Sequence, residues 1–248
     1  MILPFGLDPL TAGYMAVVIL LAAFVRGYSG FGFPALVVAA GSLVMNPLLL
    51  VPLVVVADLI LSAQMAPSAR GHVRWRVALV MSAGALVGVP LGLWVFAALP
   101  VDVVRGVLAG IVTLACLAML TGWTLPGRFG TPAALGTGFL SGMANATGVG
   151  GLPVVVLVAA LNLPPAAFRA TLLAYFVVLD IFTAVGFGVA GRLDGDMLRA
   201  MLMTLPLFLG GVWLGGRRFV NADPATFRKV AIAVLMVLAL LGLAKALL

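Results

Sequence analysis

The sequence reads Arg26-Gly-Tyr-Ser-Gly-Phe-Gly-Phe-Pro34 inside one long apolar stretch and Asn145-Ala-Thr-Gly-Val-Gly-Gly-Leu-Pro153 inside another. Glycine and proline at this density disfavour a continuous helix. Backbone that leaves the helix inside a bilayer loses its hydrogen-bond partners, so such breaks are tolerated only where they are buried in protein or line a cavity. Two breaks in corresponding positions of two halves are typical of the substrate site of a secondary transporter.

Composition assigns the chain to the polytopic helical membrane proteins. Of 248 residues, 64% are hydrophobic and 8% are charged, and the mean hydropathy is +1.28. Soluble domains carry about 25% charged residues, and several apolar runs here reach the roughly 20 residues that a helix needs to cross a bilayer. The formal net charge of +7 comes from arginines in short loops, which indicates a positive-inside bias rather than a nucleic-acid partner.

Hydropathy and Gly/Pro punctuation divide the chain into eight apolar blocks. Six are each about one span long, and the two that contain the breaks are too long for one span and too short for two. The blocks are 9–46 (broken), 50–66, 77–97, 104–122, 132–160 (broken), 169–189, 198–216 and 229–248.

The second half of the chain resembles the first. Val55-Val-Ala-Asp58 recurs as Val177-Val-Leu-Asp180 at an offset of 122 residues, and the same offset pairs Gly88 with Gly210. Because charged residues are scarce in this chain, the matched aspartates carry more weight than matched apolar letters. We infer an internal duplication, as in many transporters.

The distribution of basic residues favours an inverted repeat. If each broken block enters and leaves the membrane on one side, nine Lys and Arg residues lie inside and four lie outside, with Arg26 within the membrane. If the broken blocks instead span the membrane fully, seven lie on one side and six on the other, which is a weaker positive-inside bias. The nine are Arg70, Arg74, Arg76, Arg128, Arg169, Arg217, Arg218, Arg228 and Lys229. The sequence therefore predicts an all-α polytopic membrane protein of two homologous halves, 1–124 and 125–248, each with a re-entrant helical hairpin and about three transmembrane helices.

The breaks have the features of an anion site. The proline after each glycine run favours the first turn of a helix, so a half-helix should begin there within the membrane. Free N–H groups and the positive end of the helix dipole attract an anion, and glycine lets a ligand approach the backbone. This chemistry suits a small oxyanion, and the candidate ligand residues are Arg26, Tyr28, Ser29, Gly30, Gly32, Asn145, Thr147, Gly148, Gly150 and Gly151.

Two other interpretations of these residues stay open. The glycines could serve only to let helices cross closely. Arg26 could reach an interface or pair structurally with an acid rather than bind the substrate.

Two acids, Asp58 and Asp180, fall near the centres of blocks 50–66 and 169–189. A charge at the centre of a bilayer costs about 2.5–3.5 kcal/mol on insertion scales, so such residues are usually functional. One hypothesis is that one or both carry a proton coupled to anion movement, since apolar surroundings favour the neutral carboxyl. The alternative is a structural hydrogen bond or ion pair that holds a hairpin in place, such as Asp58 with Arg26.

The whole chain resembles the TauE/SafE family, also called the sulfite exporter or toluene sulfonate uptake permease family. The most specific part is Gly138-Phe-Leu-Ser-Gly142 running into the second break, whereas Phe31 and Phe33 make the first break less glycine-rich than in family members. The resemblance implies transport of sulfite or sulfonates, such as sulfoacetate or taurine-derived anions, across the bacterial inner membrane.

Other functions match the residues less well. Gly27-Tyr-Ser29-Gly30 resembles the serine motif of rhomboid proteases, but that chemistry needs a histidine base within the membrane, and the single histidine, His72, lies in a loop. We therefore expect no enzymatic activity, metal or cofactor. A passive anion channel or a transporter of a small carboxylate is the alternative. The expected partners are a small anion, protons as the coupling ion and membrane lipids, and a homodimer is compatible with the sequence.

Overall fold

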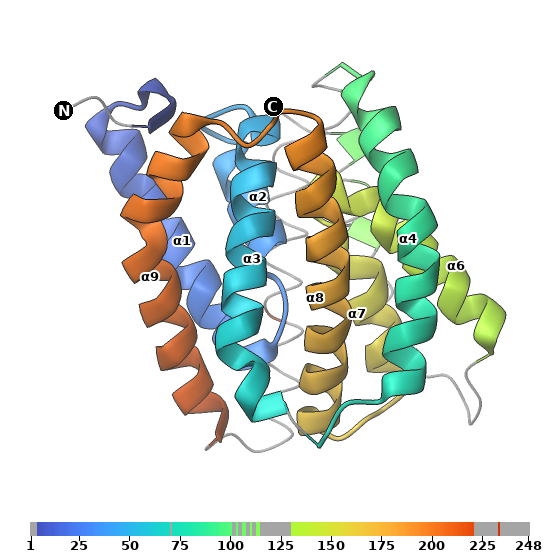
Figure 1. Ribbon diagram of the computed structural model, residues 1–248. Coiled ribbons are helices and arrows are strands. Elements are labelled where there is room, and N and C mark those ends of the chain that lie inside the picture. Colours follow the sequence, from blue (N-terminus) through green and yellow to red (C-terminus); the bar gives the residue numbers. More distant parts are fainter. Residues whose placement is uncertain are drawn as a thin grey trace.

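The computed structural model describes residues 4–69, 71–100 and 130–220, together with positions 103, 106, 107, 110, 113, 114 and 233. Within these residues every regular element is helical, as the sequence predicts (Figure 1). A short 3-10 helix at Pro4–Gly6 precedes the α-helices, which are α1 (Pro9–Ser29), α2 (Phe33–Gly41), α3 (Pro47–Ala69), α4 (Trp75–Ala97), α6 (Thr131–Asn145), α7 (Gly151–Ala160), α8 (Pro165–Val189) and α9 (Gly195–Val220).

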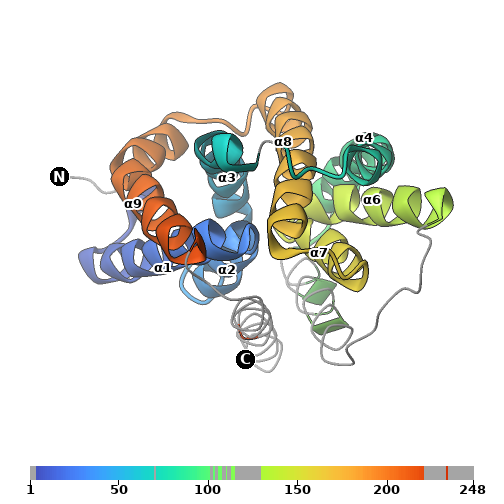
Figure 2. The same cartoon turned by 90° about the horizontal axis from the view of Figure 1, so that it is seen from below.

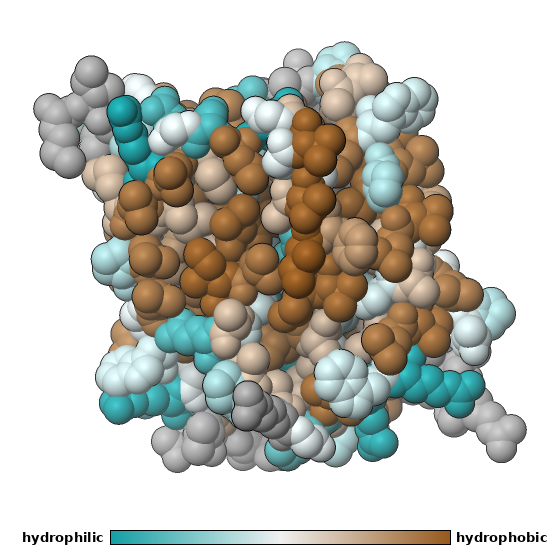
Figure 3. All heavy atoms as spheres, viewed as in Figure 1, coloured by the Kyte–Doolittle hydropathy of each residue, from teal (hydrophilic) through white to brown (hydrophobic). Residues whose placement is uncertain are grey.

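Five of these helices, α1, α3, α4, α8 and α9, are long and apolar enough to cross a membrane. The last four confirm the spans predicted at 50–66, 77–97, 169–189 and 198–216, while blocks 104–122 and 229–248 lie almost entirely outside the described residues. Figure 3 shows a broad apolar band across the visible face, with hydrophilic residues gathered above and below it. The chain is therefore a multi-pass membrane protein.

Each broken block forms two helices with a non-helical turn between them. Block 9–46 gives α1 with 21 residues and α2 with 9, and block 132–160 gives α6 with 15 and α7 with 10. Because α1 alone is long enough to span, the two arms of the first break are unequal, a feature that the sequence analysis did not predict. In Figure 1 the connection from α2 to α3 lies at the upper edge and that from α7 to α8 at the lower edge.

Two closely packed helix pairs flank a central pair (Figure 2). α1 packs against α9 and α6 packs against α4, while α3 and α8 lie side by side between them. A Cβ atom on Gly84, Gly88 or Gly92 of α4 would overlap the backbone of α6, and one on Gly215 of α9 would overlap the backbone of α1. Small residues allow such backbone approach in membranes, where lipid leaves dispersion contacts as a main packing force.

The two glycines paired at an offset of 122 residues have different surroundings. A Cβ on Gly88 would overlap the backbone of α6, whereas one on Gly210 would meet no described atom. The residue after Gly210, Gly211, instead lies against α1.

Candidate functional site

The first break places two glycines in the left-handed backbone region. Gly30 has a φ of 84° and Gly32 a φ of 94°, angles that residues with a Cβ rarely adopt. α1 therefore ends at Ser29, and α2 starts at Phe33 with Pro34 in its first turn. This confirms the predicted start of a half-helix directly after the glycine run.

The second break turns around one left-handed glycine. Gly148 has a φ of 80°, and α7 begins at Gly151, two residues before Pro153. A Cβ on Gly148 would press against the side chain of Val38 in α2. The two breaks, far apart in sequence, therefore meet in the folded protein.

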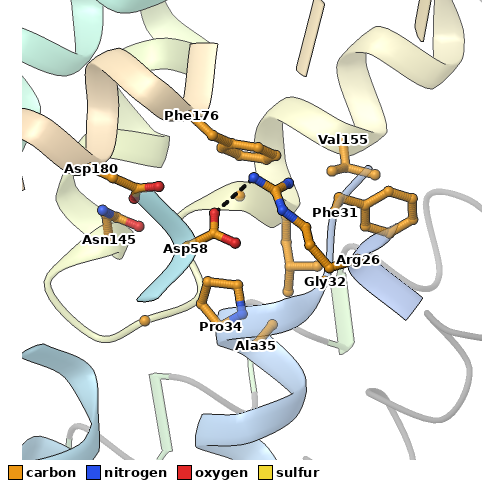
Figure 4. Close-up of a pocket in the computed structure, with 13 residues that line it drawn as sticks. Arg26, Phe31, Gly32, Pro34, Ala35, Asp58, Asn145, Val155, Phe176 and Asp180 are labelled. Carbon is orange, nitrogen blue, oxygen red and sulfur yellow. Dashed lines mark hydrogen bonds and ion pairs between the residues drawn. The ribbon is translucent and has the colours of Figure 1, made fainter. Parts of the chain in front are cut away.

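Both breaks open onto one cavity (Figure 4). The volume open to the centre of a water molecule is about 20 Å³, which is room for about one water. The polar side chains and break glycines in its wall come from both halves of the chain: Arg26, Gly32, Asp58, Asn145, Gly148, Gly151 and Asp180. All seven are among the residues predicted from the sequence, and the structure brings them together.

Arg26, in the last turn of α1, is completely buried and held by four contacts. Its Nη2 donates to Asp58 Oδ2 at 2.9 Å and to Ser62 Oγ at 2.8 Å, and its Nη1 donates to the Gly30 carbonyl oxygen. The guanidinium carbon lies 4.8 Å from the centre of the Phe176 ring, a cation–π arrangement. The ion pair with Asp58, one of the alternatives that the sequence left open, is confirmed.

Asp180 faces Asp58 across the cavity (Figure 4). Both carboxyl groups line this one cavity, and the Asn145 side chain lies beside Asp180 (Figure 4). Asn145 Nδ2 donates to Thr183 Oγ1 at 2.9 Å. One oxygen of each acid, Asp58 Oδ1 and Asp180 Oδ2, is buried without a hydrogen-bond donor from the protein.

The two predicted hydroxyl ligands cap the broken helices instead of lining the cavity. Ser29 Oγ donates to the Val25 carbonyl oxygen at 2.8 Å and accepts from the Phe31 amide at 3.3 Å. Thr147 Oγ1 donates to the Ala144 carbonyl oxygen at 2.7 Å. Both hydroxyls therefore bond to backbone at the end of their own helix, and Ser29 also accepts from the Phe31 amide in the turn.

Three further predicted residues also lie beside the cavity wall rather than in it. Gly30 supplies the carbonyl that Arg26 binds, and Gly150 supplies one to the Ser141 hydroxyl. The Tyr28 ring packs edge-on against Phe219.

Sequence reasoning missed Ser62 and Phe176, which both contact Arg26. Ser62 lies four residues after Asp58 on α3, and Phe176 lies four residues before Asp180 on α8. One helical turn from a buried acid is the same helix face, so this spacing was the signal that could have found them.

Arg169 was counted as a loop residue, but the structure places it within α8 with 8% of its surface exposed. Its Nη2 donates to the Gly27 carbonyl oxygen at 2.6 Å, and its guanidinium packs over the Phe219 ring at 4.4 Å. Its side-chain carbons lie against Gly30. A residue of the second half thus caps the C-terminal end of the first broken helix, where carbonyl oxygens lack helical partners.

The comparisons with known proteins agree with the membrane-transport chemistry of this arrangement. The family model described as "Sulfite exporter TauE/SafE" matches residues 15–241. No curated protein and no solved structure matches the chain.

Proposed function

We propose that this chain, which belongs to the sulfite exporter TauE/SafE family, is a secondary transporter of a small sulfur oxyanion or organosulfonate across the bacterial inner membrane. Family membership gives the general class, a membrane transporter of the sulfur-anion exporter type. The observation that supports the more specific proposal is the meeting of two helix breaks and a buried arginine at one cavity.

Three positive groups converge on this cavity. The first residues of α2 and α7 lie beside it, with Gly32 and Gly151 in its wall, so the positive ends of two helix dipoles face the space. Arg26 adds a full charge whose planar donor array matches an oxyanion. We propose that the substrate binds between Arg26 and the two helix starts.

The packing supports an inverted repeat of two hairpins. In the proposed repeat α1 and α2 correspond to α6 and α7, α3 corresponds to α8, and α4 corresponds to α9. Each first arm then packs on the second full span of the other half, as α1 does on α9 and α6 does on α4. Each central acid also lies beside a residue in the last turn of the preceding first arm: Asp58 bonds to Arg26, and Asp180 lies next to Asn145 (Figure 4).

The described arginines support an orientation with the α3–α4 connection inside. Five lie at or near the helix ends of that edge, namely Arg74, Arg76, Arg169, Arg217 and Arg218. Two, Arg192 and Arg199, lie at the opposite edge. Cytoplasmic loops carry the excess of basic residues.

The small size of the cavity favours a transporter over the passive channel considered above. A conducting pore needs a continuous path lined by weak sites, whereas this cavity holds about one water. We propose alternating access, coupled to protons through Asp58 and Asp180.

Counterflow in proteoliposomes tests the proposed function. Vesicles preloaded with unlabelled sulfite, sulfoacetate, acetate or the zwitterion taurine should accumulate labelled sulfite only when the internal compound is a substrate, and an imposed proton gradient should drive uptake uphill. An Arg26→Gln variant should lose this exchange, while Arg199→Gln, at an exposed position, should retain it. Flux that always stops at equal concentrations would support a channel, and uptake of labelled acetate against internal acetate without any uptake of labelled sulfite would support a carboxylate transporter.

A further inference from the structure

The cavity contains a charge imbalance. Among the described residues that line it, Arg26 is the one cation, while Asp58 and Asp180 are both acids. Their exposed fractions are 0%, 2% and 2%. With both acids ionised, the cavity would hold one uncompensated negative charge away from water, which is costly in a low-dielectric environment.

The relation between the two acids removes this imbalance. Their carboxyl groups face each other in one small cavity (Figure 4), and one oxygen of each, Asp58 Oδ1 and Asp180 Oδ2, is buried without a donor from the protein. An ionised carboxylate has no donor to offer to the other, so a proton on one acid is what can satisfy both. Two carboxyl groups that share a site in this way hold a proton between them because both cannot ionise at once. With one proton on the pair and one positive charge on Arg26, the cavity is neutral.

Ionisable groups on the neighbouring helices do not change the net charge of the cavity. Two lie on α8: the Tyr175 hydroxyl donates to Ser141 Oγ at 2.7 Å, and Arg169, which does not line the cavity, is held by the Gly27 carbonyl and the Phe219 ring. The described parts of α2, α6 and α7 contain no ionisable side chain. The other ionisable side chains on the described helices lie away from the two acids. Tyr14 donates to the Ala40 carbonyl, and Tyr28 packs on Phe219. The rest lie near helix ends: Arg76, Asp196, Arg199, Arg217 and Arg218.

We infer that the cavity takes a monovalent oxyanion, a sulfonate or hydrogensulfite, which replaces Asp58 at Arg26 while Asp58 takes up one proton. This inference rests on the proposed function and names the substrate class of the same site. The Asp58 carboxylate oxygen, 2.9 Å from Nη2, occupies the place of a substrate oxygen, since carboxylate and sulfonate oxygens make the same charge-assisted hydrogen bond with a guanidinium. Asp58 is thus the internal anion with which the substrate competes.

Charge is balanced in both states. Without substrate, Arg26 carries +1 and the acid pair carries −1 with one proton. With a monovalent anion bound, Arg26 carries +1, the anion carries −1, and both acids are neutral with two protons. The second proton comes from the solution on the side from which the anion enters, so each anion moves with one proton.

A divalent anion has no such balance. Even with both acids protonated, it leaves one negative charge uncompensated beside Arg26. An unmatched charge within the membrane weakens binding by about a hundredfold. The cavity should therefore discriminate by charge between anions of similar size.

Calorimetric binding to the purified full-length protein tests the inference. The probe between pH 6 and 8 is methanesulfonate, which is monovalent throughout, against sulfate, which is divalent throughout; hydrogensulfite is added at pH 6, where most of it is monovalent. Titrations in two buffers with different ionisation enthalpies give the number of protons taken up, which should be about one per methanesulfonate. Because binding takes up one proton, the affinity for methanesulfonate should weaken about tenfold for each rise of one pH unit. Sulfate should bind about a hundredfold more weakly than methanesulfonate.

Asparagine variants locate the proton. Asp180→Asn imitates the protonated acid, so proton uptake should stay at about one per anion. The double variant Asp58→Asn/Asp180→Asn leaves Arg26 without a competing carboxylate, so uptake should fall to about zero and affinity should lose its pH dependence. Asp196→Asn, an exposed acid at the start of α9, is the matched control and should behave like the parent protein.

The outcomes separate the inference from the proposed function. Binding without proton uptake, or sulfate bound as tightly as methanesulfonate, overturns the inference and leaves the transporter intact. Failure of every sulfur anion to bind overturns both. If the double variant does not fold, the proton count and pH slope of the parent and of Asp180→Asn still decide.

Discussion

The contribution of the Arg26–Asp58 pair to stability can be measured with a double-mutant cycle. Arg26→Met removes the cation and leaves a buried carboxyl without its partner. Loss of one partner of a buried ion pair costs about 3–5 kcal/mol, and here the Gly30 carbonyl and the Ser62 hydroxyl lose a donor as well. We therefore expect Arg26→Met to lower the free energy of unfolding by at least about 3 kcal/mol at pH 8.

The double variant Arg26→Met/Asp58→Leu should recover much of this loss. Replacing both charges by apolar groups of similar size is often neutral or stabilising by about 1–4 kcal/mol, although two polar groups still lack their donor here. Asp58 in the single variant can also take up a proton and become neutral. The destabilisation by Arg26→Met should therefore shrink as the pH falls, and that of the double variant should not.

Equilibrium unfolding in detergent micelles, followed by tryptophan fluorescence, measures these free energies. The exposed pair Arg199–Asp196, with side chains 72% and 50% exposed at 3.7 Å, is the control, and Arg199→Met should cost less than about 1 kcal/mol. Our reasoning fails if Arg26→Met costs no more than this control. It also fails if the double variant is as unstable as the sum of its two single variants.

Three further predictions concern residues around the site. Gly30→Ala should destabilise the protein by about 1–3 kcal/mol in thermal unfolding, because Gly30 has a φ of 84° and a Cβ there would press on Arg169. The control is Gly13→Ala, in an open position of α1, which should stabilise the protein by up to about 1 kcal/mol. Equal changes in stability for the two variants would contradict the argument that an alanine at position 30 is strained. Gly88→Val should separate α4 from α6 and reduce the folded fraction in size-exclusion chromatography, whereas Gly210→Val should not, since that position meets open space. Arg169→Gln should lower stability but leave the calorimetric proton uptake per anion unchanged, and a change in that count would show that Arg169 acts on the acids.

Periodicity and composition were sufficient to predict the helices and the breaks. Apolar blocks of about one span predicted α3, α4, α8 and α9, and glycine–proline runs predicted the starts of α2 and α7. These features depend on local backbone preference and on the cost of burying polar groups in lipid. Both can be evaluated from neighbouring residues in the sequence.

The composition of the cavity wall depends on contacts between distant residues, and the sequence predicted it only in part. Glycines and acids of both halves were found because each is unusual in an apolar helix. Ser29 and Thr147 were taken for ligands because a hydroxyl at a break can bind either substrate or backbone, and only the geometry of the turn shows that both bind backbone. Arg169 was placed in a loop because its burial depends on a carbonyl 142 residues away in the sequence.

The size of the cavity limits how the site can load. Space for about one water does not admit a sulfonate group, so binding requires Asp58 to leave Arg26 or the breaks to part. The second break meets its neighbours through side chains, with Gly148 against Val38 of α2 and Gly151 against the Phe176 ring of α8, and such contacts can separate without breaking backbone hydrogen bonds. The pairs α1–α9 and α4–α6 instead touch backbone to backbone along their glycines, and separating them would forfeit dispersion contacts over several turns. Opening at the breaks is therefore the less costly route, and protonation of Asp58 favours it by weakening the ion pair that holds α1 to α3.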